Sequence, residues 1–600
     1  MTRGVAVAAV AWQNAAMKDP HPRAPALAAV LLTAAAAAQS LVPAGSINGA
    51  IGGKPAAVVT PDEPAVMQYA KAIRDRFFAK AAMYGEKDLP AAFAGTSLLV
   101  YATPSHPWFE SHRKQLPFTF GDGVVAIDGR EFRGRRLRVI TAMRNPDDAA
   151  QRVVLYAATA TRDLVGINGV FHGPTEWLVA DGDTVLASGS YVQNVVLDPA
   201  ALQQDLETLL QTIKDVHPAA LDGLPAAVAE AATAAKAQFG KPLDRGGCAR
   251  LLARVLVPMH DAHTALTLPR SGETIALPFA WLAEGLVVTA EAGDLRRGDV
   301  IEALAGRDSG ELMALLAAHI PAENQHWLRL QAPGLLTDLG MLRFFGLCEK
   351  APVAVRIERD GKRIDVEVQA GPIPRPSSKT LPWARHEIDA QHSLGVFTLD
   401  RCTVDETYRE ALDAFFTAVR EAKVTRIAVD LRANSGGNSG VVDEFLRYID
   451  VESYASFSGD VRWSTAALQQ RKESGKVRFE PARANRRRNV RVEAPFAGEL
   501  FVLTGPGTFS SGNWFAVIVQ DDHLGKIVGE PTGNAPSSYG DILSFTLPNS
   551  GLAYTVSFKR WVRPDPARDP AACLEPDVAV PRTRQNVRDG TDPVLEWLRR

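Results

Sequence analysis

The sequence has little cysteine and almost no excess of one charge, and both features exclude classes of protein. Its 600 residues include four cysteines, none close to another: Cys248, Cys348, Cys402 and Cys573. This spacing excludes a C-x-x-C metal or redox motif and leaves any disulfide pairing unassigned. The 66 Lys and Arg residues against 68 Asp and Glu give a net charge of −2. The chain therefore lacks the basic surplus of proteins that bind nucleic acid, and we expect no such partner.

Long apolar runs are also missing, so no stable membrane span is predicted. The one apolar stretch near the start, residues 26–38, is short and follows a basic segment. With small residues at Ala36 and Ala38, it predicts a secretory signal peptide over residues 1–40, whose true start could be Met17. An Ala-rich helix or a membrane anchor is the alternative. We expect export to a periplasm or to the extracellular space.

The sequence lacks the two glycine motifs of nucleotide sites, G-x-x-x-x-G-K-[ST] and a G-x-G-x-x-G that opens a helix. It has instead two glycine-rich segments after apolar runs, DLRANSGGNSG (430–440) and TGPGTFSSG (504–512). Loops that follow parallel strands meet at one edge of a sheet, and their N–H groups bind anions. An oxyanion is favoured over a phosphate. From the local pattern alone, Ser510 and Ser511 are more often a helix cap than a catalytic pair.

The length exceeds what one hydrophobic core supports, so we predict an α/β multidomain protein. Residues 41–197 have the pattern of an accessory α/β domain, and residues 198–268 are helical. Residues 269–375 are rich in strands, include a hairpin with the turn DGK, and resemble a PDZ-like module. A generic small sheet domain is the alternative. Residues 376–600 alternate strands with helices, as in a parallel α/β core.

Histidines are the first candidates for a base that would activate a serine. Twelve are present, so a single histidine says little. His263 lies beside Asp261 in MHDAHTAL, and a loop histidine held by that aspartate is the alternative reading. His386 and His392 in HEIDAQH are six residues apart, too far to share one helical face, so we predict no metal site there. We expect neither a metal nor a cofactor.

Taken together, VDLRANSGGNSG, TGPGTFSSGNWFAVIVQDDHLGKIVGEPTG and the upstream MHDAHTAL resemble a family of serine peptidases. The family includes the tail-specific (carboxyl-terminal processing) proteases, the tricorn core protease and the interphotoreceptor retinoid-binding proteins. The resemblance covers roughly residues 198–585. It implies a ClpP/crotonase-like α/β core and a peptide or protein substrate. It implies nothing about the oligomeric state.

The resemblance assigns the reacting groups by their distance from GEPTG. The nucleophile would be Ser510, which lies 19 residues before Gly529. The oxyanion would receive the N–H of Ser511 and one from Gly436 or Gly437.

The base and the acid follow from the branch of the family. The Ser-Lys branch has a lysine 25 residues after the serine, where this chain has Ala535. The tricorn-like branch instead implies His263 as the base. Its acid would precede EPDVAV, and the candidates in order are Asp569, Asp565 and Glu575. Two other classes stay open: a catalytically inactive binding protein on the same fold, and an acyl-transfer or hydratase-type enzyme. The second would need a coenzyme A site, for which the sequence shows no feature.

Overall fold

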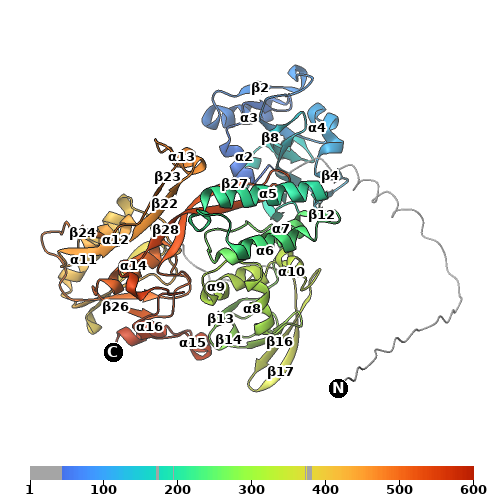
Figure 1. The fold of residues 1–600 in the computed structure, drawn as a ribbon. Coiled ribbons are helices and arrows are strands. Elements are labelled where there is room, and N and C mark those ends of the chain that lie inside the picture. Colours follow the sequence, from blue (N-terminus) through green and yellow to red (C-terminus); the bar gives the residue numbers. More distant parts are fainter. Residues whose placement is uncertain (1–43, 171–174, 194, 372, 374–380) are drawn as a thin grey trace, which may run out of the picture.

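The computed structural model describes residues 44–600 except 171–174, 194, 372 and 374–380. The predicted signal peptide lies outside the described residues. Figure 1 shows several α/β regions, with the N-terminal part in blue at one end and the C-terminal part in orange and red beside the green helices. Among the helices described, none combines the length and the apolar character needed to cross a membrane. The four cysteines are free thiols.

The N-terminal region is built on a seven-stranded mixed sheet. Its two longest strands, at Leu137–Asn145 and Asp148–Ala158, pair antiparallel over most of their length. The strand order is β10 (Thr184–Gly189), β9 (Trp177–Asp181), β7 (Leu137–Asn145), β8 (Asp148–Ala158), β3 (Leu98–Ala102), β1 (Ala57–Val59) and β2 (Ala82–Tyr84). Around it lie α2 (Ile47–Gly52), α3 (Pro64–Phe77), α4 (Pro107–His112) and a small sheet of β4 (Phe118–Gly121), β5 (Val124–Ile127) and β6 (Arg130–Arg133).

Three helices follow, α5 (Pro199–Val216), α6 (Ala226–Lys236) and α7 (Arg245–Leu256). The short β11 (Val196–Leu197) and β12 (Leu243–Asp244) pair with each other before α5 and α7. Asp198 and Asp244 cap the first turns of α5 and α7 by accepting backbone N–H groups, a residue type favoured at this position. After α7 the chain turns at His260 into the loop that holds His263.

The strand-rich region forms a five-stranded antiparallel sheet. The predicted hairpin is present: β16 and β17 pair over their full length around Asp360 and Gly361, both at positive φ, as a tight two-residue turn requires. The sheet contains β13 (Phe279–Leu282), β14 (Gly285–Val288), β15 (Val300–Leu304), β16 (Val353–Arg359) and β17 (Lys362–Val368), and its helices are α8 (Ser309–Ala317), α9 (Gln325–Leu336) and α10 (Leu339–Phe344).

The C-terminal region contains the parallel core that strand–helix alternation predicts. Five of its six strands are parallel, and β18 pairs antiparallel at one edge. The order is β18 (Ala384–Asp389), β19 (Leu394–Leu399), β20 (Arg426–Asp430), β25 (Glu499–Thr504), β26 (Lys526–Gly529) and β29 (Val578–Ala579). The helices of this region are α11 (Glu406–Glu421), α12 (Gly440–Leu446), α13 (Thr465–Arg471), α14 (Ser511–Asp521), α15 (Arg584–Asp589) and α16 (Pro593–Leu598). The mixed, multidomain α/β class is therefore confirmed.

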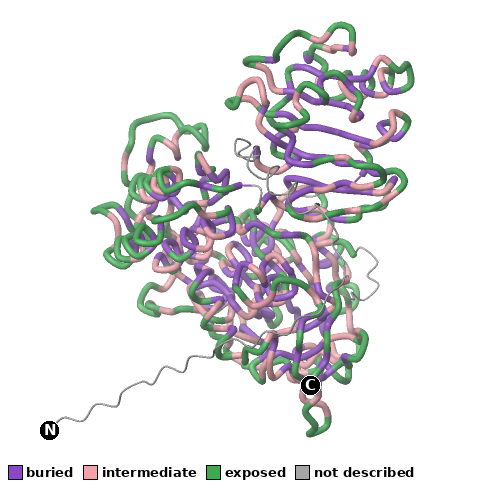
Figure 2. Tube along the Cα trace, turned by 90° about the vertical axis from the view of Figure 1, so that its right-hand side faces the viewer, coloured by how far each residue is buried: buried purple, intermediate pink, exposed green. Residues whose placement is uncertain are grey.

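A second, antiparallel sheet ties this core to the helices upstream. Its order is β23 (Arg478–Glu480), β22 (Ser458–Trp463), β28 (Ala553–Val562) and β27 (Ser538–Thr546). The long strands β27 and β28 extend to α5, as Figure 1 shows. One apolar cluster runs through these contacts and includes Val100, Leu209, Leu252, Leu335 and Tyr554. Buried segments accordingly continue from one region into the next (Figure 2).

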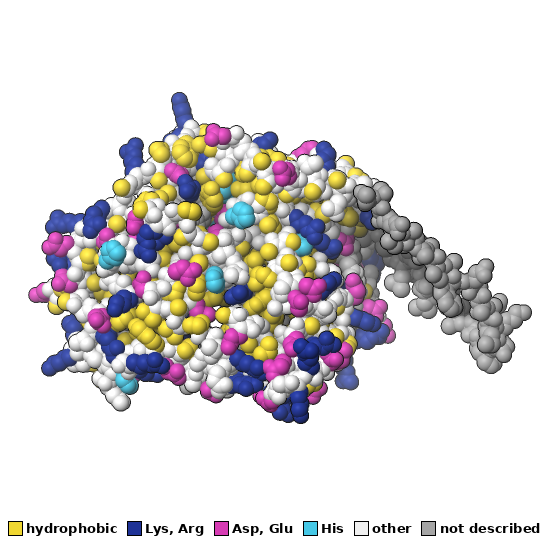
Figure 3. Space-filling model, turned by 60° about the horizontal axis from the view of Figure 1, so that its bottom comes forward, with side chains coloured by type: hydrophobic (Ala, Val, Ile, Leu, Met, Phe, Trp, Pro, Cys, Tyr) yellow, Lys and Arg dark blue, Asp and Glu magenta, His cyan; other side chains and the backbone are white. Residues whose placement is uncertain are grey.

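The arginine-rich segment ARANRRRNVR has the composition of a solvated loop, which is the structure we expect from its charge. Part of it instead forms β24 (Asn485–Arg488), paired with β21 (Ser453–Ser456). Acidic neighbours offset its charge: Arg487 pairs with Asp443, and Arg486 pairs with Asp522. On the face of the molecule in Figure 3, basic, acidic and apolar side chains of the described residues are interspersed.

A buried ion pair connects the N-terminal region to α7 and predicts a large stability effect. Both Arg245 amino groups contact Glu176, at 2.6 and 2.9 Å, and the side chains are 3% and 8% exposed. Glu176→Ala leaves the arginine charge buried and unpaired. We expect it to lower the free energy of unfolding by about 3–5 kcal/mol, measured by urea denaturation. Asp75→Ala, which breaks the exposed pair with Lys71, is the control and should have no measurable effect. Equal midpoints for the two variants would contradict this assignment.

Candidate active site

Ser510 lies at the turn between β25 and α14, in the position of a helix N-cap. Its side chain nevertheless forms no capping hydrogen bond, so the simple cap reading is not supported. The backbone has φ 50° and ψ −126°, a conformation that costs a non-glycine residue about 1–3 kcal/mol. The Ser510 N–H donates to Asn534 Oδ1 at 3.0 Å, which helps to hold this turn. The Ser510 hydroxyl therefore lies at the N-terminus of α14, the positive end of the helix dipole, and caps no backbone N–H group.

Two backbone N–H groups beside Ser510 are available to an oxyanion. Within the described residues, the N–H groups of Ser511 and Gly437 donate to no group, whereas the Gly436 N–H donates to Asn434 Oδ1 at 2.8 Å. Gly437 is therefore the better donor of the two predicted glycines. The Ser511 hydroxyl donates to the Gly437 carbonyl at 2.8 Å and so joins the two glycine-rich loops.

The loops approach so closely that a side chain would not fit. A Cβ on Gly436 would lie 2.6 Å from Ser510 Cβ and 2.9 Å from Ser511 N. Gly436 and Gly437 also have φ values of 102° and 135°, which disfavour any side chain. These glycines are thus required for the two loops to meet at the sheet edge.

His263 reaches the same region from the loop after α7. Its ring centroid lies 4.8 Å from that of Phe509, the residue before Ser510. The described residues include no hydrogen bond between His263 and the Ser510 hydroxyl, and in unliganded enzymes this contact is often long. Thr555 in β28 donates to the His263 carbonyl at 2.7 Å and fixes the loop. Burial lowers the pKa of His263 and outweighs the carboxylates of Asp261 and Asp541, so the neutral, basic imidazole is favoured.

The carboxylate beside His263 is Asp261. Its Oδ1 accepts the His263 backbone N–H at 2.9 Å and lies 3.7 Å from Nδ1 of the ring. Its Oδ2 accepts Nε2–H of the buried His217 at 3.1 Å, because Nδ1 of His217 is itself an acceptor from the Ala219 N–H. Burial raises the pKa of Asp261, but the His217 hydrogen bond and the charge interactions with both imidazoles hold it at about 2. Asp261 is therefore an ionised, fixed carboxylate.

The acids expected from the resemblance have other partners. Asp569 accepts the Ser537 hydroxyl and lies 4.0 Å from Arg563. Asp565 caps a short 3-10 helix through its contact with the Ala567 N–H. Glu575 accepts a weak hydrogen bond from the Cys573 thiol. Of these four carboxylates, Asp261 is the one that contacts His263, so we propose it as a further candidate for the acid beside Asp569 and Asp565, which stay predictions.

Two residues of this region are missed by the sequence reasoning. Glu323, just before α9, accepts Asn534 Nδ2–H at 3.0 Å through Oε1, and Asn534 in turn holds the Ser510 N–H. Burial, and then the charge of Asp261, raise the pKa of Glu323 to about 8. Trp327 stacks on Phe509 with ring centroids 4.1 Å apart. Their positions depend on contacts between distant segments, and no motif marks them.

The predicted position of a lysine base is occupied by Ala535, which is buried and whose carbonyl accepts Asn513 Nδ2–H at 3.1 Å. The side-chain amide of Asn513 and the backbone carbonyls of Asn534 and Ala535 therefore lie where a Ser-Lys dyad would place its lysine. The two histidines of the rejected zinc motif have separate partners: the His386 ring lies 5.7 Å from that of Phe415 in α11, and His392 pairs with Asp389 at 2.9 Å.

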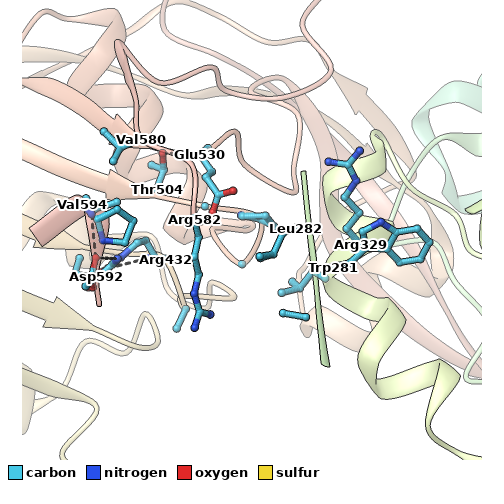
Figure 4. A pocket seen from close by; sticks show the side chains of 18 of the residues that line it. Trp281, Leu282, Arg329, Arg432, Thr504, Glu530, Val580, Arg582, Asp592 and Val594 are labelled. Carbon is cyan, nitrogen blue, oxygen red and sulfur yellow. Dashed lines mark hydrogen bonds and ion pairs between the residues drawn. The ribbon is translucent and has the colours of Figure 1, made fainter. Parts of the chain in front are cut away.

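A separate cavity of about 510 Å³ lies where α9 and β13 face the carboxyl ends of the core strands. Figure 4 shows Trp281 and Arg329 on one side and Glu530 and Arg582 on the other. Neither Ser510 nor His263 lines it.

Arg432 lines this cavity and supports the glycine-rich loop. It pairs with Asp430 at 2.7 Å, as a structural support of the glycine-rich loop requires, and also with Asp592 at 2.8 Å. The dashed lines in Figure 4 mark this second contact.

Comparison with known proteins places these residues in a family. Residues 393–580 match the model of peptidase family S41, and a search of curated proteins gives no significant match. Among solved structures, mature CPAF in complex with lactacystin is similar, with a TM-score of 0.50, 12% identity, and coverage of 66% of this chain and 97% of that one. Mature CPAF by itself gives a TM-score of 0.50, 14% identity, and coverage of 66% and 96%. The photosystem II D1 C-terminal processing protease gives a TM-score of 0.36, 15% identity, and coverage of 66% and 98%.

At these identities the structural likeness shows the fold alone, and the family match identifies the domain. The match contains both glycine-rich loops and GEPTG, the segments on which the resemblance rests. The match includes Asp565 and Asp569. It begins after His263, so the proposed base lies outside it. This chain therefore carries a peptidase family S41 domain, and it is a serine-type peptidase whose substrate is a peptide or protein.

Proposed function

We propose that the protein hydrolyses peptide bonds through an acyl-enzyme on Ser510, with His263 as the general base. The observation that carries this proposal is the uncapped Ser510 hydroxyl at the N-terminus of α14, beside two N–H groups that donate to no described residue. A positioned serine, a neighbouring neutral imidazole and an oxyanion site are the components that acyl transfer requires.

The reaction has two stages. His263 Nε2 takes the Ser510 proton as the hydroxyl oxygen attacks the peptide carbonyl, and the resulting imidazolium then donates that proton to the leaving amine. Water next attacks the acyl-enzyme, again with His263 as the base, and releases the acid product. The Ser511 and Gly437 N–H groups stabilise the oxyanion in both stages, a contribution of about 3–4 kcal/mol per donor in other enzymes. Asp261 favours the tautomer with the proton on Nδ1 and stabilises the imidazolium.

The class of the core and the regions outside the S41 match extend the proposal. We assign the core to the ClpP/crotonase-like class, residues 269–375 to a PDZ-like module that captures an extended peptide segment, and residues 41–197 to an accessory domain. Residues 1–40 are proposed as the export signal, which directs the peptidase to a periplasm or beyond. The antiparallel sheet β13–β17 and the site contacts of Glu323 and Trp327 support a role for the module near the nucleophile.

Labelling with a serine-directed phosphonate tests the nucleophile. We expect wild-type protein and Ser511→Ala to be labelled and Ser510→Ala to be unlabelled, as detected by intact-protein mass spectrometry. Ser511→Ala is the matched control because it removes a neighbouring hydroxyl but keeps the backbone N–H. Labelling that persists in Ser510→Ala would refute the assignment. An unlabelled but folded wild-type protein would favour the inactive binding protein.

A further inference from the structure

The cluster of Asp261, His263 and Glu323 has the composition of a metal site. One ligand atom from each residue lies within 4.8 Å of the others, and the three come from two separate segments of the chain. One imidazole and two carboxylates are donors that suit zinc. Tetrahedral coordination at about 2.1 Å requires ligand atoms about 3.4 Å apart, so only small side-chain movements separate the cluster from that geometry.

Two atoms of the cluster are buried without any hydrogen-bond partner. These are His263 Nδ1 and Glu323 Oε2, two buried atoms on side chains that are otherwise partly exposed. Buried polar atoms are rarely left unsatisfied, because each costs about 1–3 kcal/mol. An ion between them would satisfy both atoms.

The groups behind the ligands are arranged as in metal sites. His217 donates to Asp261 Oδ2, and Asn534 donates to Glu323 Oε1. Asp261 is thus fixed through both oxygens, since Oδ1 also accepts the His263 N–H, and Glu323 is fixed through Oε1 and keeps Oε2 for the cluster. Outer partners of this kind orient the ligands of bound metals.

We propose that Asp261, His263 and Glu323 bind a zinc ion and that this ion switches off the peptidase. Binding does not depend on the proposed reaction, whereas the inhibition rests on it. A metal on Nδ1 leaves the imidazole proton on Nε2, so that nitrogen no longer accepts the proton of Ser510. Zinc would therefore block the base without touching the nucleophile.

Calorimetric titration of metal-free, full-length Ser510→Ala with ZnCl₂ tests the binding. We expect one site per chain, and we expect Glu323→Gln and His263→Gln in the same background to weaken it about tenfold or more. His392→Asn is the matched control, because it removes a surface histidine that also pairs with an aspartate and should leave the titration unchanged. The melting temperature should rise with zinc in Ser510→Ala and rise less in the two ligand variants at the same zinc concentration.

The result that would overturn the site is unchanged zinc affinity in both ligand variants, or equal loss in His392→Asn. Circular dichroism without zinc verifies that each variant is folded. Inhibition is measured separately on the wild type: zinc should abolish peptide cleavage, and a chelator should restore it. Zinc that binds at this cluster without inhibition would refute the switch but keep the site. A wild type without peptidase activity would instead refute the proposed function, and the titration would still decide the binding.

Discussion

Ser510→Ala is expected to lower kcat for peptide hydrolysis by about 10⁴- to 10⁶-fold, because it removes the atom that forms the acyl-enzyme. The fold should be unaffected, since the Ser510 hydroxyl caps no N–H group and its backbone contacts to Asn534 and Trp514 do not involve the side chain. Steady-state hydrolysis of a denatured protein substrate, followed by product mass spectrometry, measures the loss.

The kcat of Ser511→Ala is to be compared with that of Ser510→Ala. It removes the hydrogen bond to the Gly437 carbonyl, so its effect should be a smaller loss through a looser oxyanion loop, with the N–H retained. If Ser511→Ala were the inactive variant and Ser510→Ala the active one, the spacing argument that separates the two serines would be wrong.

Asp261→Asn is expected to lower kcat by about 10³- to 10⁴-fold. The amide keeps the shape of the side chain and an oxygen for the His263 N–H, but it no longer stabilises an imidazolium at 3.7 Å from the carboxylate. Because Asp261 is fully buried, a thermal melt should accompany the kinetics to verify that the variant is folded. KM should change little, since Asp261 contacts the base and not the substrate.

Asp569→Asn and Asp565→Asn decide between Asp261 and the acids that the resemblance implies. Asp569 contacts Ser537 and Arg563, and Asp565 caps a short helix, so each variant should retain kcat within about tenfold of the wild type. A loss in Asp569→Asn as large as that in Asp261→Asn would restore the acid of the tricorn-like branch.

Local patterns sufficed where the determining interactions are short in range. The hairpin around Asp360 and Gly361 follows from turn chemistry, and the parallel core follows from strands that alternate with helices. The resemblance distinguishes Ser510 from Ser511 by the distance from Gly529, an interval that contains one helix and one strand. Charge alone did not predict the secondary structure of ARANRRRNVR. Pairing with β21 and two acidic partners stabilises a strand there in place of a loop.

The sequence by itself determined the family of the domain, the proposed nucleophile, the glycine-rich loops that surround it and the histidine proposed as base. These follow from a family resemblance that short motifs carry, namely MHDAHTAL, the two glycine-rich segments and GEPTG. Only the tertiary structure decided which carboxylate stands beside His263 and that Glu323 joins the site. Asp261 was visible as a neighbour in sequence, but its ionised state depends on His217, 44 residues away in the chain. Glu323 meets Asn534 across 211 residues, and such contacts arise from the packing of separate regions, which no local pattern encodes.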